Sequence, residues 1–582
     1  MVTAKLFGRA AALAALVLFL GTTSSSQSTD YGPAKVAYDD YIKRPSLQMR
    51  SRGRYRLAQT GDIRAMKILY ESYAKKYTPQ DQEHYLITSI TAKFFSDEAH
   101  VPIWKEWREK YPAATEAWLW YRSLMIHGAV KGDDELLSVA KTHKELFIRA
   151  AAIEAMAENN SEKLLPFLDE LCAGLGELKG IDRIVMTETA ARCLYSQAFH
   201  YGTDLFRKPA MKLIDMLDDK DTNARTKLVI ARYLRETLGG DNLWINAKPW
   251  HWKLLNPNKP MPVGDDGKDG RYAEPPKPKF VGVEAAGSRI AYVIDLSDSM
   301  MTPFTAKEKE EIKKPPPPKP RGPVTGGGEG GKKEPREEPK KEEPKAEEKP
   351  PEKEVEDDMP WDKIKCRFHV AREYLKLSLK GLLPDQFYCV IVFGTQAKLM
   401  NSTKGLIQAT PAAIQATIKE LDMIKPGPPT AVRKHGVLMG DTNLHGGIHR
   451  AFKVRKSGMG KEYEYVDPVG FTDGADTVFI LSDGDPTDDD WAIDDKRDKD
   501  DQTGDPETNV KAPDQPVLNF PGPYGYFLPK SVMGELLTDD VRRLNLFRKC
   551  EIHCIGIGEV SAGLLSRIAE CGMGECKMVG KQ

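Results

Sequence analysis

Five oxygen-bearing side chains stand around two apolar segments in the carboxyl-terminal half of the chain. Asp295, Ser297 and Ser299 lie in "IDLSDSM", at the end of the apolar run "RIAYV", and Asp483 follows the run "TVFILS". Thr442, in "GDTNLHGG", lies between these two segments. Carboxylates, hydroxyls and water suit a hard cation, with Mg²⁺ first and Mn²⁺ or Ca²⁺ as alternatives. Because each residue alone is also an ordinary turn or capping residue, the hypothesis rests on their combination.

The elements that would position these side chains alternate between strands and helices. The carboxyl-terminal half contains four short apolar runs, which predict strands at 289–295, 387–393, 476–482 and 551–557. Four segments between and after them predict helices at 364–382, 411–424, 444–454 and 533–550. Strands that are almost continuously apolar are typical of a sheet covered by helices on both faces. The alternation predicts a doubly wound α/β sheet, with functional groups beyond the carboxyl ends of its strands. We therefore expect the five side chains to converge on one edge.

This arrangement resembles the von Willebrand factor A (VWA) domain and its metal-ion-dependent adhesion site (MIDAS). That family uses Asp-x-Ser-x-Ser, then a Thr in a Gly-rich loop, then an Asp usually followed by Gly, and all five positions occur here in order within 280–582. The resemblance implies a protein-binding module in which the cation takes an Asp or Glu side chain from a protein partner. Two residues depart from the pattern, since Asp298 and Asp441 stand where the family often has Gly. Both add negative charge near the expected metal.

The amino-terminal half is predicted to be helical. Over residues 31–245, apolar residues recur at intervals of three and four, and short polar breaks separate the segments. This pattern predicts an all-α, solenoid-like domain that loosely resembles HEAT repeats, with a plain helical bundle as the alternative. A helical region ahead of such an α/β domain also resembles exported bacterial proteins of unassigned role. Residues 246–279, rich in Pro, Gly, Asp and Lys, predict a linker.

Two polar segments are predicted to interrupt the α/β domain. Residues 303–361 are rich in Pro, Lys and Glu and have almost no aromatic or β-branched content, so they predict a disordered insertion. Residues 485–530 contain an aspartate-rich stretch without the glycine and spacing of an EF-hand, so they predict a solvated acidic loop.

The charge composition and the amino-terminal segment indicate where the protein is located and whether it binds nucleic acid. The 85 Lys and Arg residues balance the 85 Asp and Glu residues, which gives no electrostatic reason to expect nucleic-acid binding. Residues 1–26 have basic residues, a short apolar run and then small residues, as in a secretory signal peptide, with an uncleaved anchor as the alternative. No later segment predicts a membrane span. We expect an exported protein of the periplasm, cell surface or extracellular space, in which Cys571 and Cys576 could pair.

These patterns favour a binding protein over an enzyme, because no nucleophile–base pair is evident. The alternatives are a metal-assisted hydrolase with Asp483 or Asp298 as base, and a structural scaffold of an envelope complex that acts through its helical domain. His445 and His449 stand four residues apart on a predicted helix and could face one metal. Without the glutamate of the metalloprotease pattern, they are expected to be core or surface histidines.

Overall fold

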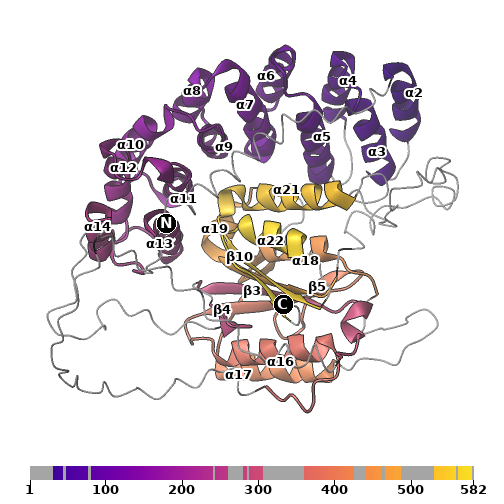
Figure 1. Ribbon diagram of the computed structural model, residues 1–582, viewed down its shortest axis with the longest axis vertical. Helices are drawn as coiled ribbons and strands as arrows, with labels where there is room; N and C mark the ends of the chain where they lie inside the picture. The colour runs from indigo at the N-terminus through magenta and orange to yellow at the C-terminus, as the bar shows by residue number, and fades with distance from the viewer. Residues whose placement is uncertain are drawn as a thin grey trace, which may run out of the picture.

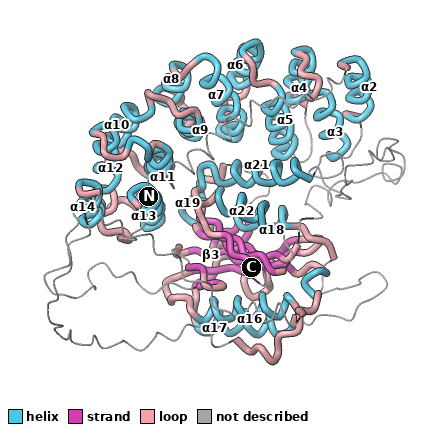
Figure 2. The backbone as a smooth tube through the Cα atoms, viewed as in Figure 1, coloured by secondary structure: helices cyan, strands magenta, loops and turns pink. Residues whose placement is uncertain are grey.

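The protein folds into a helical arch and an α/β domain that lies under it (Figure 1). The computed structural model describes residues 30–43, 47–75, 80–239, 243–257, 259, 279–284, 287–305, 359–424, 440–460, 466–484, 486, 530–558 and 562–579. Figure 2 shows the strands gathered in the α/β domain and helices throughout the arch. The predicted combination of a helical amino-terminal region and a carboxyl-terminal α/β domain is therefore found.

The arch consists of successive helices joined by short turns. Side chains at several helix starts accept a hydrogen bond from a backbone N–H, as Asp62, Thr203 and Asn223 do, which satisfies donors that the helix itself cannot. The α-helices are α2 (Tyr31–Tyr41), α3 (Leu47–Ala58), α4 (Ile63–Tyr73), α5 (Gln80–Phe94), α6 (Val101–Lys110), α7 (Ala117–Lys131), α8 (Asp134–Thr142), α9 (Leu146–Glu158), α10 (Leu164–Gly174), α11 (Gly180–Ser196), α12 (Asp204–Asp215), α13 (Ala224–Leu238) and α14 (Ala247–Leu255). Short 3₁₀ turns η1 (Glu98–His100), η2 (Ala114–Glu116) and η3 (Ala198–His200) lie between them.

Alternate helices of the arch contact each other. Helices α3, α5, α7, α9, α11 and α13 touch in succession, and α10, α12 and α14 do the same. Helix α14 lies inside the predicted linker 246–279, where Trp250 is fully buried and donates to the carbonyl of Trp244. The start of the predicted linker therefore packs as one more helix of the arch, and the domain bounds stay a prediction. A HEAT-like repeat stays a prediction.

The central sheet has seven strands in the order β11-β10-β9-β3-β4-β5, with β6 also paired to β4. Strands β3, β4, β9, β10 and β11 run parallel, whereas β5 and β6 pair antiparallel with β4. Their bounds are β3 (Arg289–Asp295), β4 (Phe387–Phe393), β5 (Ala397–Leu399), β6 (Ile407–Gln408), β9 (Thr477–Ser482), β10 (Glu551–Ile557) and β11 (Cys576–Val579). The four predicted strands form the centre of the sheet. Two small hairpins, β1 (Lys279–Phe280) with β2 (Val283–Glu284) and β7 (Val454–Arg455) with β8 (Gly458–Met459), lie outside it.

Helices cover both faces of the sheet, as the apolar strands predict (Figure 1). Side chains of β3 alternate between two cores, with Tyr292 on the α16 face and Val293 on the α18 face. The helices of this domain are α16 (Arg367–Lys380), α17 (Pro411–Met423), α18 (Leu444–Lys453), α19 (Pro468–Asp473), α21 (Lys530–Arg548) and α22 (Ala562–Glu570), with the 3₁₀ turn η5 (Asp298–Met301). The predicted doubly wound α/β sheet is therefore found for the central, parallel strands. The two short strands β5 and β6, which pair with β4, are antiparallel.

Helix α21 of the α/β domain lies along the inner side of the arch (Figure 1). Phe547 packs edge-on against Phe147 of α9, with ring centroids 5.3 Å apart, and both belong to the hydrophobic core of the arch. Charged groups accompany this packing, since Lys549 Nζ lies 2.6 Å from Glu154 Oε1, and both side chains are buried. The hydrophobic core of the arch therefore includes side chains of the α/β domain.

Several predicted segments lie outside the described residues. These are the signal segment 1–26, nearly all of the insertion 303–361 and nearly all of the acidic loop 485–530. All eight cysteines are described and none is in a disulfide, so the pairing of Cys571 with Cys576 is not found. A search of the described helices for one with the length and hydropathy to cross a bilayer found none.

Candidate functional site

Two buried carboxylates stand side by side at the carboxyl edge of the sheet. Asp295 is the last residue of β3, and Asp483 directly follows β9, the strand paired with β3. Both side chains are almost fully buried. Asp295 Oδ2 accepts a hydrogen bond of 2.6 Å from Ser482 Oγ, and Asp295 Oδ1 accepts one of 2.7 Å from the backbone N–H of Ser297. The parallel pairing of β3 with β9 is therefore what brings the two carboxylates to one place.

The two serines of the predicted site connect these carboxylates. Ser297 immediately precedes the 3₁₀ turn η5, and Ser299 lies within it. Their Oγ atoms lie 3.0 Å apart, and Ser299 Oγ donates to Asp483 Oδ1 at 2.6 Å. Four of the five predicted residues thus form a continuous chain of polar contacts.

Thr442 reaches the same place from the start of helix α18. A Cβ atom at Gly484 would lie 3.8 Å from Ser299 Oγ and 3.9 Å from Thr442 Oγ1, so both hydroxyls border this glycine. Asn443 holds the threonine in position, because its side chain caps α18 and its N–H donates to the carbonyl of Gly394 after β4. The structure therefore brings all five predicted residues together at one edge.

A positive charge that the sequence analysis did not anticipate also lies here. Arg367, the first residue of α16, donates from Nη1 to Asp483 Oδ2 at 2.9 Å. Burial and then the negative charge of Asp483 raise the pKa of Asp295 to about 7. Burial also raises the pKa of Asp483, although hydrogen bonds from Ser299 and Arg367 oppose the shift. One guanidinium thus accompanies two carboxylates, and a divalent cation would supply the missing positive charge.

The two aspartates that depart from the family pattern have different surroundings. Asp298 is engaged by the loop that carries Thr442, because its Oδ1 accepts from the N–H of Gly440 at 3.2 Å and its own N–H donates to the carbonyl of Gly440 at 2.8 Å. Gly440 has a φ of +75°, a conformation that favours glycine. Asp441 is exposed to solvent, and its N–H donates to Thr395 Oγ1. Asp298 therefore joins two loops of the site.

Arg367 and Ser482 are the residues of this edge that sequence reasoning missed. Ser482 stands immediately before Asp483 in the quoted motif, so its proximity was available from the strand assignment. Arg367 is separated from Ser299 by the long polar insertion, and nothing in its local sequence marks it. Only the packing of α16 against β3 and η5 brings its guanidinium to Asp483.

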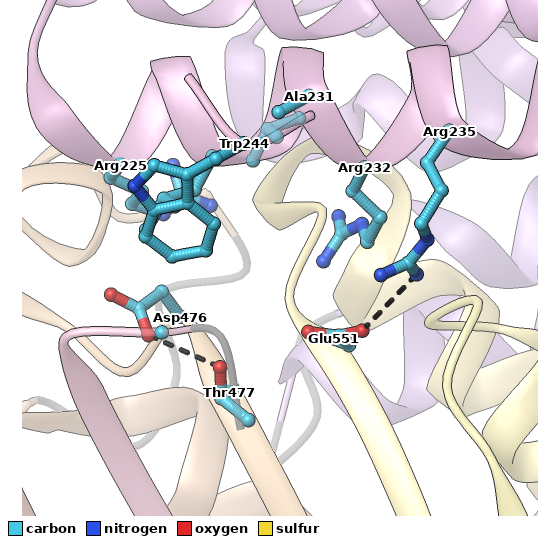
Figure 3. A pocket seen from close by; sticks show the side chains of 11 residues that line it. Arg225, Ala231, Arg232, Arg235, Trp244, Asp476, Thr477 and Glu551 are labelled. Atoms are coloured by element: carbon cyan, nitrogen blue, oxygen red, sulfur yellow. Dashed lines mark hydrogen bonds and ion pairs between the residues drawn. The ribbon is translucent and has the colours of Figure 1, made fainter. Parts of the chain in front are cut away.

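A pocket at the opposite, amino-terminal edge of the sheet lies under helix α13 (Figure 3). Arg225, Arg232 and Arg235 of α13 line it together with Asp476 and Glu551 of the α/β domain. Arg235 pairs with Glu551 at 3.9 Å, and Arg225 pairs with Glu188 of α11 at 2.8 Å. The Arg235–Glu551 pair joins the two domains, whereas the Arg225–Glu188 pair lies within the arch.

Comparisons with known proteins give no further information about the site. No family model matches the chain, and no curated protein matches it. A solved structure described as von Willebrand factor type A from Catenulispora acidiphila is similar, with a TM-score of 0.24 and 11% identity. The similarity covers 51% of this chain and 40% of the solved chain, so this chain spans less than half of the length of the solved one. At this level it adds nothing to what the strand order and the side-chain contacts show.

Proposed function

We propose that this chain is a binding protein that holds a divalent cation, Mg²⁺ first, at the carboxyl edge of its sheet. Its ligands would be Asp295, Ser297, Ser299, Thr442 and Asp483, directly or through water. The observation that carries the proposal is the convergence of two buried carboxylates from neighbouring strands with three hydroxyls. Oxygen donors of this kind suit Mg²⁺, with Mn²⁺ and Ca²⁺ as alternatives.

An acidic side chain from a protein partner would complete the coordination. The order of the motif, which resembles the MIDAS of VWA domains, supports this part of the proposal. Arg367 supports it as well, because its guanidinium would attract an incoming carboxylate. Once a divalent ion is bound, it and the guanidinium of Arg367 carry three positive charges against the two buried carboxylates, whereas Asp298 and Asp441 of the surrounding loops oppose an anionic ligand. Export of the protein remains part of the proposal and rests on the amino-terminal sequence.

The hydrolase alternative has less support. Asp298 accepts a hydrogen bond from the N–H of Gly440, and Asp483 accepts from Ser299 and Arg367, so both candidate bases already bind donors of the protein itself. The scaffold alternative, in which the arch recognises the partner, is limited by α21, which lies along the inner side of the arch (Figure 1). A partner of the arch would therefore bind its outer side.

The test is calorimetric titration of the full chain with Mg²⁺ and Mn²⁺. The D295N and D483N variants should each lose cation binding, because each removes a charge that the ion needs. D422N is the matched control, since Asp422 is an exposed carboxylate that pairs with Lys376 away from the site. Binding that is unchanged in both D295N and D483N, with both variants folded, would contradict the proposed site.

The ligand class needs a separate measurement. Peptides selected from a random library against the immobilised full chain in Mg²⁺ should be enriched in Asp or Glu, and chelator should release them. Replacing the enriched acidic residue by its amide should abolish binding. Peptides that bind equally well with chelator would contradict a cation-mediated ligand, even if the cation itself binds.

A further inference from the structure

A second group of metal-ligating side chains lies between helices α18 and α21. His445 and His449 are one turn apart on α18, so their rings share a side of the helix with centroids 4.0 Å apart. Asp540 faces them from α21, and its Oδ2 lies 3.2 Å from His445 Nε2 and 2.6 Å from His449 Nε2. All three side chains are buried, and their ligand atoms lie within 4.8 Å of one another.

We propose that His445, His449 and Asp540 bind a transition-metal ion, zinc first, at a site separate from the cation site of the sheet edge. Ligand atoms of a tetrahedral zinc ion, bound at roughly 2.0–2.1 Å, lie about 3.3 Å from one another. The 3.2 Å separation at His445 fits this geometry, and the 2.6 Å separation at His449 must widen by about 0.7 Å to reach it. Two imidazole nitrogens and one carboxylate oxygen select zinc, cobalt or nickel over magnesium.

Two of the three groups, His449 and Asp540, are held in the protonation state that metal binding needs. Burial, followed by the neighbouring His445, lowers the pKa of His449 to about 3, so this imidazole is neutral. Burial alone would raise the pKa of Asp540, but the guanidinium of Arg543 and the two imidazoles hold it well below its usual range. A neutral imidazole and an ionised carboxylate can bind the ion without first losing a proton.

Arg543 orients the carboxylate of Asp540, and Asp81 in turn balances the charge of Arg543. Asp540 Oδ1 accepts from Arg543 Nε at 2.8 Å, which leaves Oδ2 directed at the two imidazoles. Arg543 Nη1 in turn donates to both carboxylate oxygens of Asp81 in α5, at 3.0 and 3.1 Å. The carboxylates of Asp540 and Asp81 outnumber the guanidinium of Arg543 by one negative charge, which favours a cation. Such outer partners are typical of protein metal sites.

The competing structure is a metal-free network in which both imidazoles donate to Asp540. The two structures differ in a measurable way, because only the metal site gives cobalt a nitrogen-containing, four-coordinate environment. The cation site of the sheet edge offers oxygen ligands alone, so it cannot produce the same spectrum. The experiment therefore separates this proposal from the proposed function as well.

The test is titration of the chelator-treated full chain with Zn²⁺ and with Co²⁺. We expect one tightly held zinc per chain and an intense visible absorbance with cobalt, as tetrahedral coordination produces. The H445Q and H449Q variants should each weaken zinc binding by about 100-fold or more, whereas H143Q, which alters a histidine of the arch, and D295N should leave it unchanged. Folded wild-type protein that takes up no zinc, or H445Q and H449Q variants that bind zinc as tightly as wild type, would overturn the proposal.

A second measurement covers the case in which a variant does not fold. X-ray absorption on zinc-loaded wild-type protein should show imidazole scattering from two histidines. A coordination shell of oxygen atoms alone would overturn the proposal without the use of any variant.

Discussion

Arg367 Nη1 lies 2.9 Å from Asp483 Oδ2, so a guanidinium contacts one of the two carboxylates proposed to bind the cation. Arg367 and the cation would compete for the same negative charge. We expect R367Q to tighten Mn²⁺ binding by about tenfold, the equivalent of one charge-assisted hydrogen bond. Calorimetry checks this, with R372Q as the control, since Arg372 lies on the same helix and pairs with Glu373. Weaker Mn²⁺ binding in R367Q would mean that the arginine supports the cation instead.

The position of helix α18 should control the affinity of the cation site. A Cβ at Gly447 would lie 2.8 Å from Val293 Cγ1 and 3.1 Å from Phe393 Cδ1, so G447A should push α18 away from the sheet. Thr442 precedes this helix and should move with it. We expect a loss of about 1–3 kcal/mol in the free energy of unfolding and weaker Mn²⁺ binding. The measurements are chemical denaturation and calorimetry.

The control for this prediction is G563A in helix α22. A Cβ at Gly563 meets nothing within 4 Å, so alanine should stabilise the protein by roughly 0.5–1 kcal/mol and leave Mn²⁺ affinity unchanged. If G447A behaved like G563A, the close packing of α18 on β3 and β4 would not position Thr442.

The buried ion pair between Glu154 and Lys549 should strongly stabilise the contact between the arch and the α/β domain. Glu154 also faces Arg192 at 3.0 Å, so E154Q removes the carboxylate from two cations, whereas K549M leaves Glu154 with Arg192. We expect E154Q to cost about 3–5 kcal/mol in the free energy of unfolding and K549M to cost less. Guanidinium denaturation measures both.

An exposed pair across neighbouring helices serves as the control for the buried one. Lys141 and Glu170 lie 2.6 Å apart, and both side chains are solvent-exposed. K141M should change the free energy of unfolding by at most about 1 kcal/mol. A cost as small as this in E154Q would show that the buried contact does not hold the two domains together.

Glu551 should make the stability of the protein depend on pH. Burial alone would raise its pKa, but His553, Arg232 and Arg235 lower the pKa to about 2, well below the usual glutamate value of 4.5. Because the folded protein then binds the proton more weakly than the unfolded chain, this stability is present above pH 4.5 and is lost as the pH falls toward 2. At pH 7 we expect E551Q to lose about 2–3 kcal/mol relative to wild type.

The measurement is urea denaturation of wild type and E551Q between pH 7 and the lowest pH at which wild type stays folded. The difference between the two proteins should shrink below pH 4.5. A difference that stayed constant down to pH 3 would show that the ionised carboxylate is not what Glu551 contributes.

The sequence predicted the centre of the sheet because its strands are short, apolar and bounded by polar turns. The runs ending at Asp295 and Ser482 are of this kind, so their adjacency at one edge followed from a parallel sheet. The edge strands β5, β6 and β11 were missed, since two to four residues are too few to show a period. Helix α14 was missed because it begins a segment, 246–279, that is rich in Pro, Gly, Asp and Lys and so resembles a linker.

Contacts between distant segments had no local signal. The pairing of Arg367 with Asp483 joins residues 116 positions apart, and that of Asp540 with His449 joins residues 91 positions apart. The i, i+4 spacing of His445 and His449 was visible, but the third ligand lies on another helix. Only the placement of α21 between the arch and α18 reveals it.

Helix α21 covers the inner side of the arch, but the ribosome makes it long after the arch itself. The arch ends at Leu255, whereas α21 begins at Lys530, about 275 residues later. At roughly 5–20 residues per second, the ribosome takes about 15–55 s to deliver the helix that covers this surface. During that interval Phe147 and its apolar neighbours are exposed on the nascent chain, which makes the arch a substrate for chaperones until its own carboxyl-terminal half arrives.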